Sequence, residues 1–338
     1  ASSTIKDYKN AWKQPWTQEV GKLPIKEIKP IILSKWYSKY KKIKPRATEK
    51  VYTMIGKAYK YAKPLIGLTD NIVLTDVNEL IERVKYEPND EYIDAKTELP
   101  HFLNAIHHYS TIQRSMQSVL EGSVDRYMTP EDREMIKGFM KFSLEHQGSK
   151  KFRRINETVR DWILFALFYG LRRAESSKLE WSMIDMKKKS ITLPARITKM
   201  RRELILPTTF LSEMLFISRW NKPDRNNKYV FQGQTNKTKN SYIKEERGTT
   251  EKLIEWVREK SNNPKFHMSM HDLRPTCTNI LKEMGVAYED RARIQNHSVK
   301  KDAHSIYLRD YIEVQRKILT DYHHYLLACG DDVSAEES

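Results

Sequence analysis

The sequence predicts an α+β protein that is mainly helical, has one small β-sheet and is divided into two domains. Apolar residues recur at helical spacing through most of the chain, and two short stretches in its second half alternate like strands. A length of 338 residues is enough for about two domains. The expected parts are a helical domain at 1–88, a linker at 89–96, a second domain at 97–327 and an acidic tail at 328–338.

The first domain is expected to be a small helical bundle. Polar breaks divide it into three or four helices, of which one is predicted from Ile28 to Tyr40 and another from Ala47 to Ala62. Apolar side chains at helical spacing are expected to form the packed faces of these two helices. They are Ile28, Ile31, Ile32, Trp36 and Tyr40 in the first helix and Val51, Ile55, Ala58 and Tyr59 in the second.

The second domain is expected to contain a central buried helix and two β-strands. Residues 155–169 are apolar on most sides, which is typical of a helix inside a core. Strands are predicted at 190–193 and 203–207, on either side of the basic turn Lys199-Met200-Arg201-Arg202. The remainder is predicted to be mainly helical, with an exposed loop or hairpin at 226–240 and an amphipathic helix at 310–327.

The composition favours a polyanionic partner. Lysine and arginine total 60 against 44 acidic residues, which gives a net charge of +16 and a pI near 9.5. Ribosomal, membrane-surface and heparin-binding proteins share such a composition, so charge alone does not define the partner. Because the charge of the first domain is largely of one sign, its basic residues and those of the strand turn are interpreted as DNA-backbone contacts, and the alternative is a solvated basic face. The candidates are Lys39, Lys41, Lys42, Lys44, Arg46, Lys57, Arg201 and Arg202.

Several classes of protein are excluded by composition. With only two cysteines, the chain has neither a disulfide framework nor a four-cysteine zinc site. The longest apolar stretch, at 162–169, is far short of the ~20 residues that span a bilayer, and no signal peptide opens the chain. These features predict a cytoplasmic protein, and a DNA partner would place it at the nucleoid. Ala1 in place of methionine is typical of a processed or engineered start.

A set of reactive residues in the second domain is suited to breaking a phosphodiester bond. Attack on a DNA phosphate needs a nucleophile, positive donors for the nonbridging oxygens and an acid for the departing 5′ oxygen, and arginines remove the need for a metal. In chain order the donors would be Arg172, His271, Arg274 and His297, and Tyr307 would be the nucleophile. Each residue alone is more often structural, so the inference depends on their order and spacing.

Three further residues have competing interpretations. Tyr311 is a rival nucleophile, but its distance from His297 fits less well than that of Tyr307. His267 and His271 have a spacing that could bind a metal on a helix, but no third ligand is evident, so no metal or cofactor is expected. Glu175 either orients the region around Arg172 or is an ordinary acid on a helix surface.

These residues resemble the conserved blocks of the tyrosine recombinase, or phage integrase, family. The blocks are Gly170-Leu171-Arg172-Arg173-Ala174-Glu175, His271-Asp272-Leu273-Arg274 and Asn296-His297, followed by Tyr307, with Lys199 in the strand turn. The segments Arg196 to Arg202 and Tyr307 to Tyr311 are similar to those of integrases from satellite phages and genomic islands. The resemblance covers residues 150–327, and residues 1–88 look like the family's core-binding domain by pattern. Asn296 replaces a residue that is usually small, and the spacing from Thr97 to Arg172 implies an insertion near 110–150.

The resemblance implies a role for each residue. Arg172 and Arg274 would grip the scissile phosphate, His271 would donate a hydrogen bond or assist proton transfer, and His297 would support the phosphate from the other side. Lys199 would protonate the leaving 5′ hydroxyl. Tyr307 would form a 3′-phosphotyrosyl link that preserves the bond energy.

The resemblance also implies an assembly and leaves rival functions open. Two domains would clamp double-stranded attachment sites, and a homotetramer, coupled through the C-terminal helix, would exchange strands through a Holliday junction. DNA-bending or directionality factors would be its further partners. The rivals are a type IB topoisomerase or hairpin telomere resolvase with the same chemistry, and a noncatalytic DNA-binding regulator on the same fold.

Overall fold

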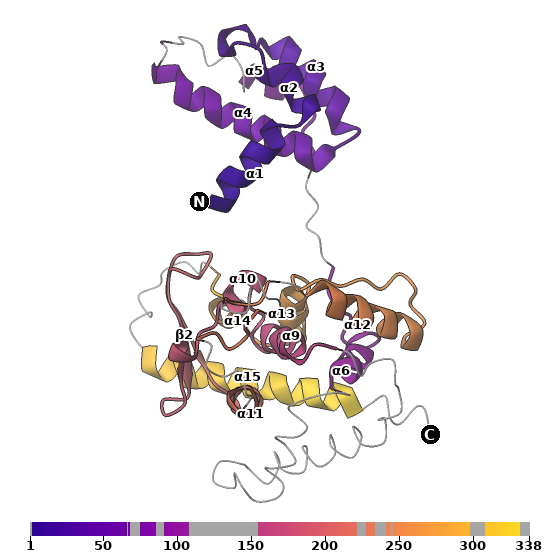
Figure 1. Ribbon diagram of the computed structural model, residues 1–338, viewed down its shortest axis with the longest axis vertical. Helices are drawn as coiled ribbons and strands as arrows, with labels where there is room; N and C mark the ends of the chain where they lie inside the picture. Colours follow the sequence, from indigo (N-terminus) through magenta and orange to yellow (C-terminus); the bar gives the residue numbers. More distant parts are fainter. Residues whose placement is uncertain are drawn as a thin grey trace, which may run out of the picture. The chain divides into compact units, whose positions relative to one another are not determined.

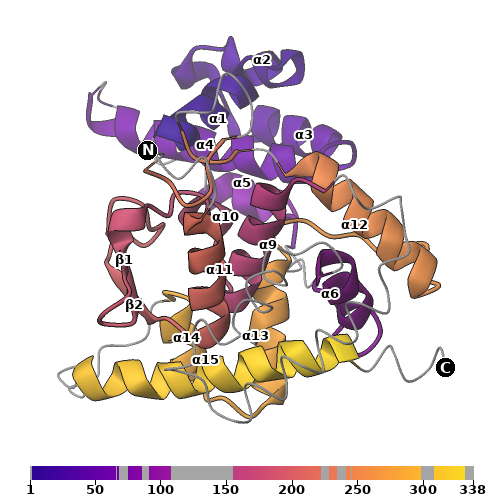
Figure 2. The ribbon, with the colours of Figure 1, turned by 60° about the horizontal axis from the view of Figure 1, so that its bottom comes forward.

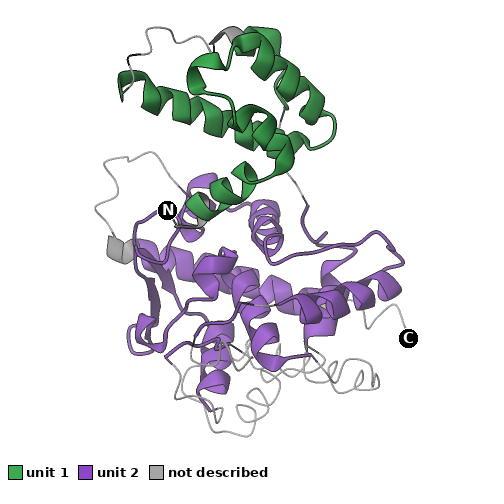
Figure 3. Ribbon diagram, turned by 45° about the horizontal axis from the view of Figure 1, so that its top comes forward, with its two compact units in different colours: residues 1–89 green, residues 90–338 purple. Residues whose placement is uncertain are grey.

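The computed structural model describes residues 2–65, 67, 75–85, 91–107, 155–221, 228–233, 241–244, 246–297 and 308–331. The chain divides into two compact units, Ala1–Asn89 and Asp90–Ser338 (Figure 3). Each unit has its own hydrophobic core. The structure is mainly helical with one small antiparallel sheet, so the predicted fold class is confirmed (Figure 1).

The first unit is a bundle of helices around an aromatic core. Trp16 stacks on Trp36 with 5.7 Å between ring centroids, and the indole N–H of Trp36 donates to the carbonyl of Trp16 at 2.9 Å. Tyr37 and Tyr52 meet edge to face at 5.2 Å. Such ring pairs stabilise a core beyond the area that they bury. The elements are α1 (Ser2–Trp12), α2 (Pro15–Gly21), η1 (Ile25–Glu27), α3 (Pro30–Lys41), α4 (Pro45–Leu65) and α5 (Thr75–Leu80).

The packed face of α3 matches the predicted one at Trp36 and Tyr40 but differs at Ile31 and Ile32. Ile31 and Ile32 are 53% and 37% exposed, whereas Leu33 and Tyr37 are fully buried. Pro30 begins the helix, so Ile28 lies before it and does not set the rotation of the buried face. The aromatic residues set it instead, because the buried side chains follow the spacing i, i+3, i+4, i+7 from Leu33. In α4 the prediction was wrong for Ala58, which is exposed.

The second unit places its helices around α9 and one edge of its sheet (Figures 1 and 2). Its helices are α6 (Leu99–His107), α9 (Glu157–Tyr169), α10 (Arg173–Ser176), η4 (Trp181–Met183), α11 (Phe210–Trp220), α12 (Arg247–Lys260), α13 (Leu273–Glu283), α14 (Tyr288–Ile294) and α15 (Leu308–Asp331). Its strands are β1 (Ile184–Asp185), β2 (Ser190–Leu193) and β3 (Leu204–Pro207).

Helix α9 is the centre of this unit, as the sequence predicts. Asn156 caps it by accepting a hydrogen bond from the N–H of Val159 at 3.1 Å. Every side chain from Thr158 to Tyr169 is buried. Gly170 ends the helix with φ 57°, a left-handed conformation that favours glycine. The chain therefore turns sharply and places Arg172 just beyond a rigid, buried helix.

The sheet has the strand order β1-β2-β3, and both pairs are antiparallel. Strands β2 and β3 match the two predicted strands, with Leu193 opposite Leu204 next to the turn. The sequence did not predict β1, because its two residues are too few to show an alternating pattern. The turn that carries Lys199 thus extends from the end of a short hairpin.

Helix α15 runs along the second unit and joins its core (Figure 2). Leu319, Tyr322 and Leu326 are buried, and the hydroxyl of Tyr322 donates to the carbonyl of Leu167 in α9 at 3.1 Å. Nη1 of Arg316 donates to the carbonyls of Lys189 and Thr208, at 3.1 and 2.5 Å, at the base of the hairpin. The helix is therefore fastened to both α9 and the sheet of its own chain.

The second unit begins earlier and ends later than the sequence predicts. Ile93 and Ala95, in the expected linker, belong to its core, and the N–H of Ile93 donates to Oγ1 of Thr276 at 2.9 Å. Helix α15 continues into the expected acidic tail, where Cys329 is buried. The linker expected at 89–96 is therefore shorter than predicted, because Ile93 already belongs to the core of the second unit.

The segment at 226–240 is not exposed throughout, contrary to the sequence prediction. Val230 and Phe231, inside the expected exposed loop at 226–240, are buried. The expected insertion at 110–150 lies outside the described residues, as does 332–338 of the tail. Within the ranges described above, no helix combines the length and apolar character needed to cross a bilayer.

Replacing Gly170 by alanine is expected to destabilise the second unit by about 2–4 kcal/mol, because a left-handed alanine is strained and the new methyl group is crowded. A Cβ at this position would lie 2.5 Å from Nε2 of Gln295 and 3.0 Å from Sγ of Cys277. The measurement is the free energy of unfolding in urea.

Gly285→Ala is the matched control. Gly285 has φ 79° but no atom within 4 Å of the Cβ position, so only the backbone strain of about 1–2 kcal/mol is expected. Equal losses in the two variants would show that the contact with Gln295 and Cys277 is not tight.

Candidate active site

The first site arginine is held by a buried carboxylate. Arg172 precedes α10, and its Nη1 donates to Oε1 of Glu175 at 3.1 Å. Oε2 of Glu175 accepts the backbone N–H of Arg172 at 3.3 Å. The side chain of Glu175 is 1% exposed, whereas that of Arg172 is 18% exposed. Glu175 is therefore not an ordinary surface acid but orients Arg172, one of the two interpretations that the sequence left open.

The same carboxylate reaches the strand turn. Oε1 of Glu175 accepts the backbone N–H of Lys199 at 3.0 Å. Thr198 closes the turn, because its hydroxyl donates to the carbonyl of Arg202 at 2.7 Å and accepts the N–H of Arg202 at 3.2 Å. The side chain of Lys199 is exposed, and among the described residues its ammonium has no acidic partner. The backbone of Lys199 is thus fixed while its ammonium stays available.

Arg274 joins three segments of the second unit. It lies in the first turn of α13 and is 6% exposed. Its Nη1 donates to the carbonyl of Gly170 at 2.8 Å, and its Nη2 donates to the carbonyl of Gln295 at 2.6 Å. These bonds place its guanidinium between the end of α9 and the residues that follow α14.

The segment before His297 is built from buried polar residues. Gln295 is 1% exposed, its Nε2 donates to the carbonyl of Arg274 at 3.2 Å and its Oε1 accepts the hydroxyl of Thr278 at 2.9 Å. Asn296 has φ 55° and is 3% exposed. Asparagine tolerates this left-handed conformation, which accounts for its presence where a small residue is usual. The segment is polar because it bonds to α13 rather than packing as an apolar layer.

Positive charge accumulates around this site. Burial, and then repulsion from Arg172, lowers the pKa of Arg274 to about 10. Burial, followed by Arg274 and Arg172, lowers the pKa of His297 to about 4, so its imidazole is neutral near pH 7. Glu175 acts in the opposite direction on both groups. One carboxylate thus faces two guanidinium groups, an arrangement that favours a bound anion.

Of the two remaining predicted catalytic residues, the structure describes His271 but not Tyr307. His271 is exposed, and within the described part of the chain its imidazole makes no hydrogen bond. Tyr307 lies outside the described residues, one position before α15 begins. The hydroxyl of Tyr311 donates to Asp290 at 2.7 Å, and burial, then this bond, raises the pKa of Tyr311 above its usual value. Tyr311 is therefore a poor nucleophile.

The described residues offer no metal site. His267 and His271 lie before α13, so their spacing does not place them on one helical face. No group of three or more histidine, cysteine or acidic residues with metal-binding geometry occurs in the ranges that the structure covers.

Ion pairs within the first unit neutralise part of its basic surface. Nζ of Lys39 lies 3.0 Å from Glu19, and Nζ of Lys41 lies 3.0 Å from Glu82 and 2.7 Å from its carbonyl. Lys44 lies over the ring of Trp16 at 5.6 Å. The premise that this surface carries charge of one sign was wrong for Lys39 and Lys41, because acids distant in sequence fold next to them. The other candidates, Lys42, Arg46, Lys57 and Arg201, are exposed.

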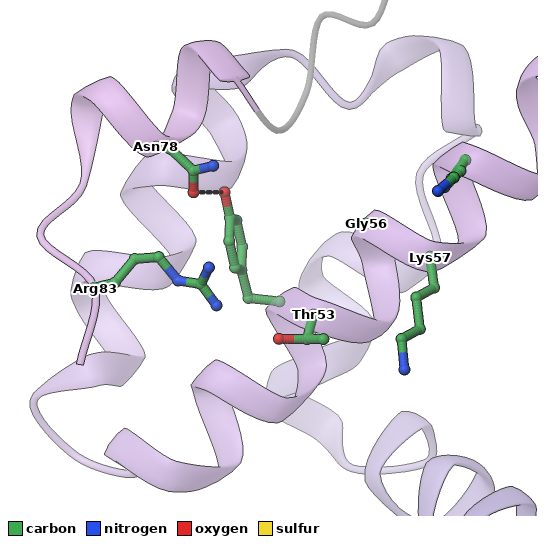
Figure 4. A pocket seen from close by; sticks show the side chains of 7 residues that line it. Thr53, Gly56, Lys57, Asn78 and Arg83 are labelled. Carbon is green, nitrogen blue, oxygen red and sulfur yellow. Dashed lines mark hydrogen bonds between the residues drawn. The ribbon is translucent and has the colours of Figure 1, made fainter. Parts of the chain in front are cut away.

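A basic pocket lies on the same unit, between α4 and the residues around α5 (Figure 4). The hydroxyl of Tyr52 donates to Oδ1 of Asn78 at 2.9 Å in its wall. The guanidinium of Arg83 lies 5.5 Å from the ring of Tyr52 and is paired with Glu49. Nζ of Lys57 donates to the hydroxyl of Tyr8 at 3.2 Å. The lining residues are Tyr52, Thr53, Gly56, Lys57, Lys60, Asn78 and Arg83.

The phage integrase family matches the chain over residues 134–313, more than half of its length. The fold is also similar to solved structures. A lambda integrase tetramer bound to a Holliday junction is 11% identical with a TM-score of 0.53, over 91% of this chain and 75% of that one. The XerH site-specific recombinase bound to a palindromic difH substrate is 15% identical with a TM-score of 0.52, over 93% and 76%. The Tn1549 transposon integrase with circular intermediate DNA is 14% identical with a TM-score of 0.51, over 93% and 98%. No curated protein sequence matches.

The fold and the arginine-rich site define a tyrosine recombinase. The chain belongs to the phage integrase family, and it is a site-specific DNA recombinase. The resemblance that the sequence motifs indicate is therefore confirmed.

His297 is expected to titrate with a midpoint near pH 4 in the free protein. An unfolded histidine binds its proton near pH 6.5. Between these values the unfolded chain binds more protons, so the contribution of His297 to the free energy of unfolding falls as the pH drops from about 6.5 to about 4. The measurement is an NMR titration of the imidazole.

The His297→Gln variant identifies the resonance and serves as the stability control. Its free energy of unfolding is expected to lose this part of the pH dependence, while the contribution of the buried His323, with the same sign, is retained. A midpoint near 6.5 would show that neither burial nor the two guanidinium groups lowers the pKa of His297.

Proposed function

We propose that the enzyme cleaves and rejoins double-stranded attachment sites through a 3′-phosphotyrosyl intermediate at Tyr307. Arg172 and Arg274 bind the scissile phosphate, and His297, neutral at pH 7, donates a hydrogen bond to a nonbridging oxygen. His271 assists from the exposed start of α13. Lys199 protonates the 5′ oxygen as its bond to phosphorus breaks, so the leaving strand departs as a 5′ hydroxyl.

The observation that carries this proposal is the pair of guanidinium groups fixed by protein oxygens. Arg172 is bonded to Glu175, and Arg274 to the carbonyls of Gly170 and Gln295. Burial, and then repulsion from Arg172, lowers the pKa of Arg274 before any ligand binds. A pentavalent phosphate carries more negative charge than its ground state, so it gains most from such a preorganised site.

The proposal includes an assembly on DNA. Two units close around the duplex, four protomers pair two attachment sites, and strands exchange through a Holliday junction. Because Leu319, Tyr322 and Leu326 are buried in their own unit, a contact of the C-terminal helix with a neighbouring protomer would use its outer face, where Val314 is exposed, or residues beyond Asp331. DNA-bending or directionality factors act with it at the nucleoid of the cytoplasm.

The first unit contacts the DNA backbone in this proposal. The pocket brings three basic residues together, of which Arg83 is paired with Glu49 and Lys57 and Lys60 have no acidic partner among the described residues. Lysine and arginine supply the phosphate contacts of most DNA-binding proteins, and these contacts set affinity rather than sequence preference. Lys42, Lys44 and Arg46 are further candidate contacts of the first unit, and Arg201 is a separate candidate in the second unit. Lys39 and Lys41 contribute less because Glu19 and Glu82 neutralise them.

A nicked suicide half-site is expected to trap a covalent protein–DNA adduct with the unaltered chain. Tyr307→Phe removes the nucleophile and should abolish the adduct. Tyr311→Phe is the matched control and should retain it, because the Tyr311 hydroxyl is bonded to Asp290. The readout is a shifted band on a denaturing gel.

Each contrary outcome has a defined meaning. An adduct that persists in Tyr307→Phe and disappears in Tyr311→Phe would reassign the nucleophile. No adduct with the unaltered chain would favour a noncatalytic DNA-binding regulator. Relaxation of supercoiled plasmid without two attachment sites, by a monomer, would favour a type IB topoisomerase.

Replacing Lys57 and Lys60 together by glutamine is expected to reduce the salt dependence of DNA binding. Each lost phosphate contact lowers the slope of log K against log salt by about 1, and the affinity falls on every sequence alike. The measurement is fluorescence anisotropy with the full chain at several salt concentrations. Replacing both residues by arginine keeps the charge and should keep the slope. An unchanged slope in the glutamine variant would exclude the pocket from the DNA surface.

A further inference from the structure

We propose that Arg202 and Asn296 form a clasp that positions Lys199 and His297 for strand cleavage. Arg202 then acts through neighbouring protein groups, whereas the sequence suggests a contact to the DNA backbone. This inference rests on the proposed function, because it concerns the same cleavage step.

The clasp joins two segments that are far apart in the sequence. Nε of Arg202 donates to Oδ1 of Asn296 at 2.6 Å, and Nη2 of Arg202 donates to the carbonyl of His297. One planar guanidinium therefore engages two consecutive residues, which fixes its orientation as well as its position. Two of its five N–H donors are directed into the protein rather than toward solvent.

On one side the clasp fixes the turn that carries Lys199. The backbone of Arg202 is bonded in both directions to the hydroxyl of Thr198, the residue directly before Lys199. The N–H of Lys199 is bonded to Glu175, which also holds Arg172. The turn is thereby attached to the Arg172 region through Glu175 and to the His297 region through Arg202. Because the lysine side chain is flexible, its backbone must be held in place if the ammonium is to deliver a proton to one particular oxygen.

On the other side the clasp depends on the identity of residue 296. Asn296 is 3% exposed with φ 55°, a conformation that glycine adopts more easily. Glycine would fit the backbone but would offer no side-chain oxygen to Arg202. Because Nε of Arg202 can only donate, the amide of Asn296 must turn Oδ1 toward it. Its buried Nδ2 then finds no acceptor in the part of the chain that the structure describes, a destabilising arrangement that is typical of functional sites.

The first test separates positioning from DNA contact. Arg202→Gln is compared with Arg196→Gln, which removes the same charge from an exposed position of the same turn. We expect Arg202→Gln to retain the affinity and salt slope of DNA binding but to lower the rate of adduct formation at saturating DNA by about 10–100-fold, the effect typical of residues that hold catalytic groups. Arg196→Gln should cleave at the rate of the unaltered chain.

The second test identifies the group that the clasp positions. In a half-site with sulfur in place of the 5′ bridging oxygen, attack of Tyr307 on phosphorus breaks the P–S bond, and the thiolate leaves without needing a proton. The rate deficit of Arg202→Gln should shrink by about tenfold or more on this substrate, because it no longer requires the acid Lys199. Arg172→Lys, which impairs phosphate binding, should show the same rate deficit relative to the unaltered chain on both substrates.

Asn296→Gly provides an independent variant, because glycine adopts the left-handed backbone and the change removes the side chain that carries the acceptor Oδ1. Its rate of adduct formation should be lowered as in Arg202→Gln and should recover in the same way on the sulfur-substituted half-site. The double variant should be no slower than either single variant. Thermal unfolding of each variant checks that the fold is retained.

The contrary outcomes are distinct. Weaker DNA binding by Arg202→Gln with a shallower salt slope and a full rate at saturation would identify a backbone contact and overturn the clasp. An equal deficit on the oxygen and sulfur substrates would show that the clasp does not act through Lys199, and would also overturn it. No adduct with the unaltered chain would instead overturn the proposed function itself.

Discussion

The buried guanidinium of Arg274 is the interaction on which the rest of the site depends. It bonds to carbonyls on both sides of α13, at the end of α9 and after α14, so its position fixes where these segments meet. The same burial places two positive charges close together, which is unfavourable in the free protein. The large apolar core around α9 offsets this local repulsion. The repulsion between the two guanidinium groups thus lowers the stability of the free protein, while the same two charges favour the binding of an anion.

Polar residues in the interior carry out most of the positioning. Glu175 and Gln295 bond to backbone groups of neighbouring segments, and Thr198 bonds to the backbone of its own turn. None of the three is expected to contact DNA. Backbone bonds of this kind fix a chain more firmly than a contact between two long side chains, because fewer rotatable bonds must be ordered. The reactive side chains can therefore remain partly exposed while their backbones are held.

The sequence predicted the elements whose signal is local. The continuous apolar run of α9, the alternating strands β2 and β3 and the order of the catalytic blocks can all be read from neighbouring residues. It did not predict the rotation of α3 or the ion pair between Lys39 and Glu19, because both arise from residues brought together only by folding. Glu175 and Asn296 were ambiguous for the same reason. Their roles depend on burial and on a left-handed backbone, neither of which is visible in the sequence pattern.

The bonds from Arg316 to the carbonyls of Lys189 and Thr208 have a mechanical consequence. They attach the helix that follows Tyr307 to the base of the hairpin whose tip carries Lys199. The helix and the hairpin are therefore mechanically coupled, so a displacement of the helix that leaves these bonds intact also displaces the hairpin. Moving the helix independently would require breaking both bonds.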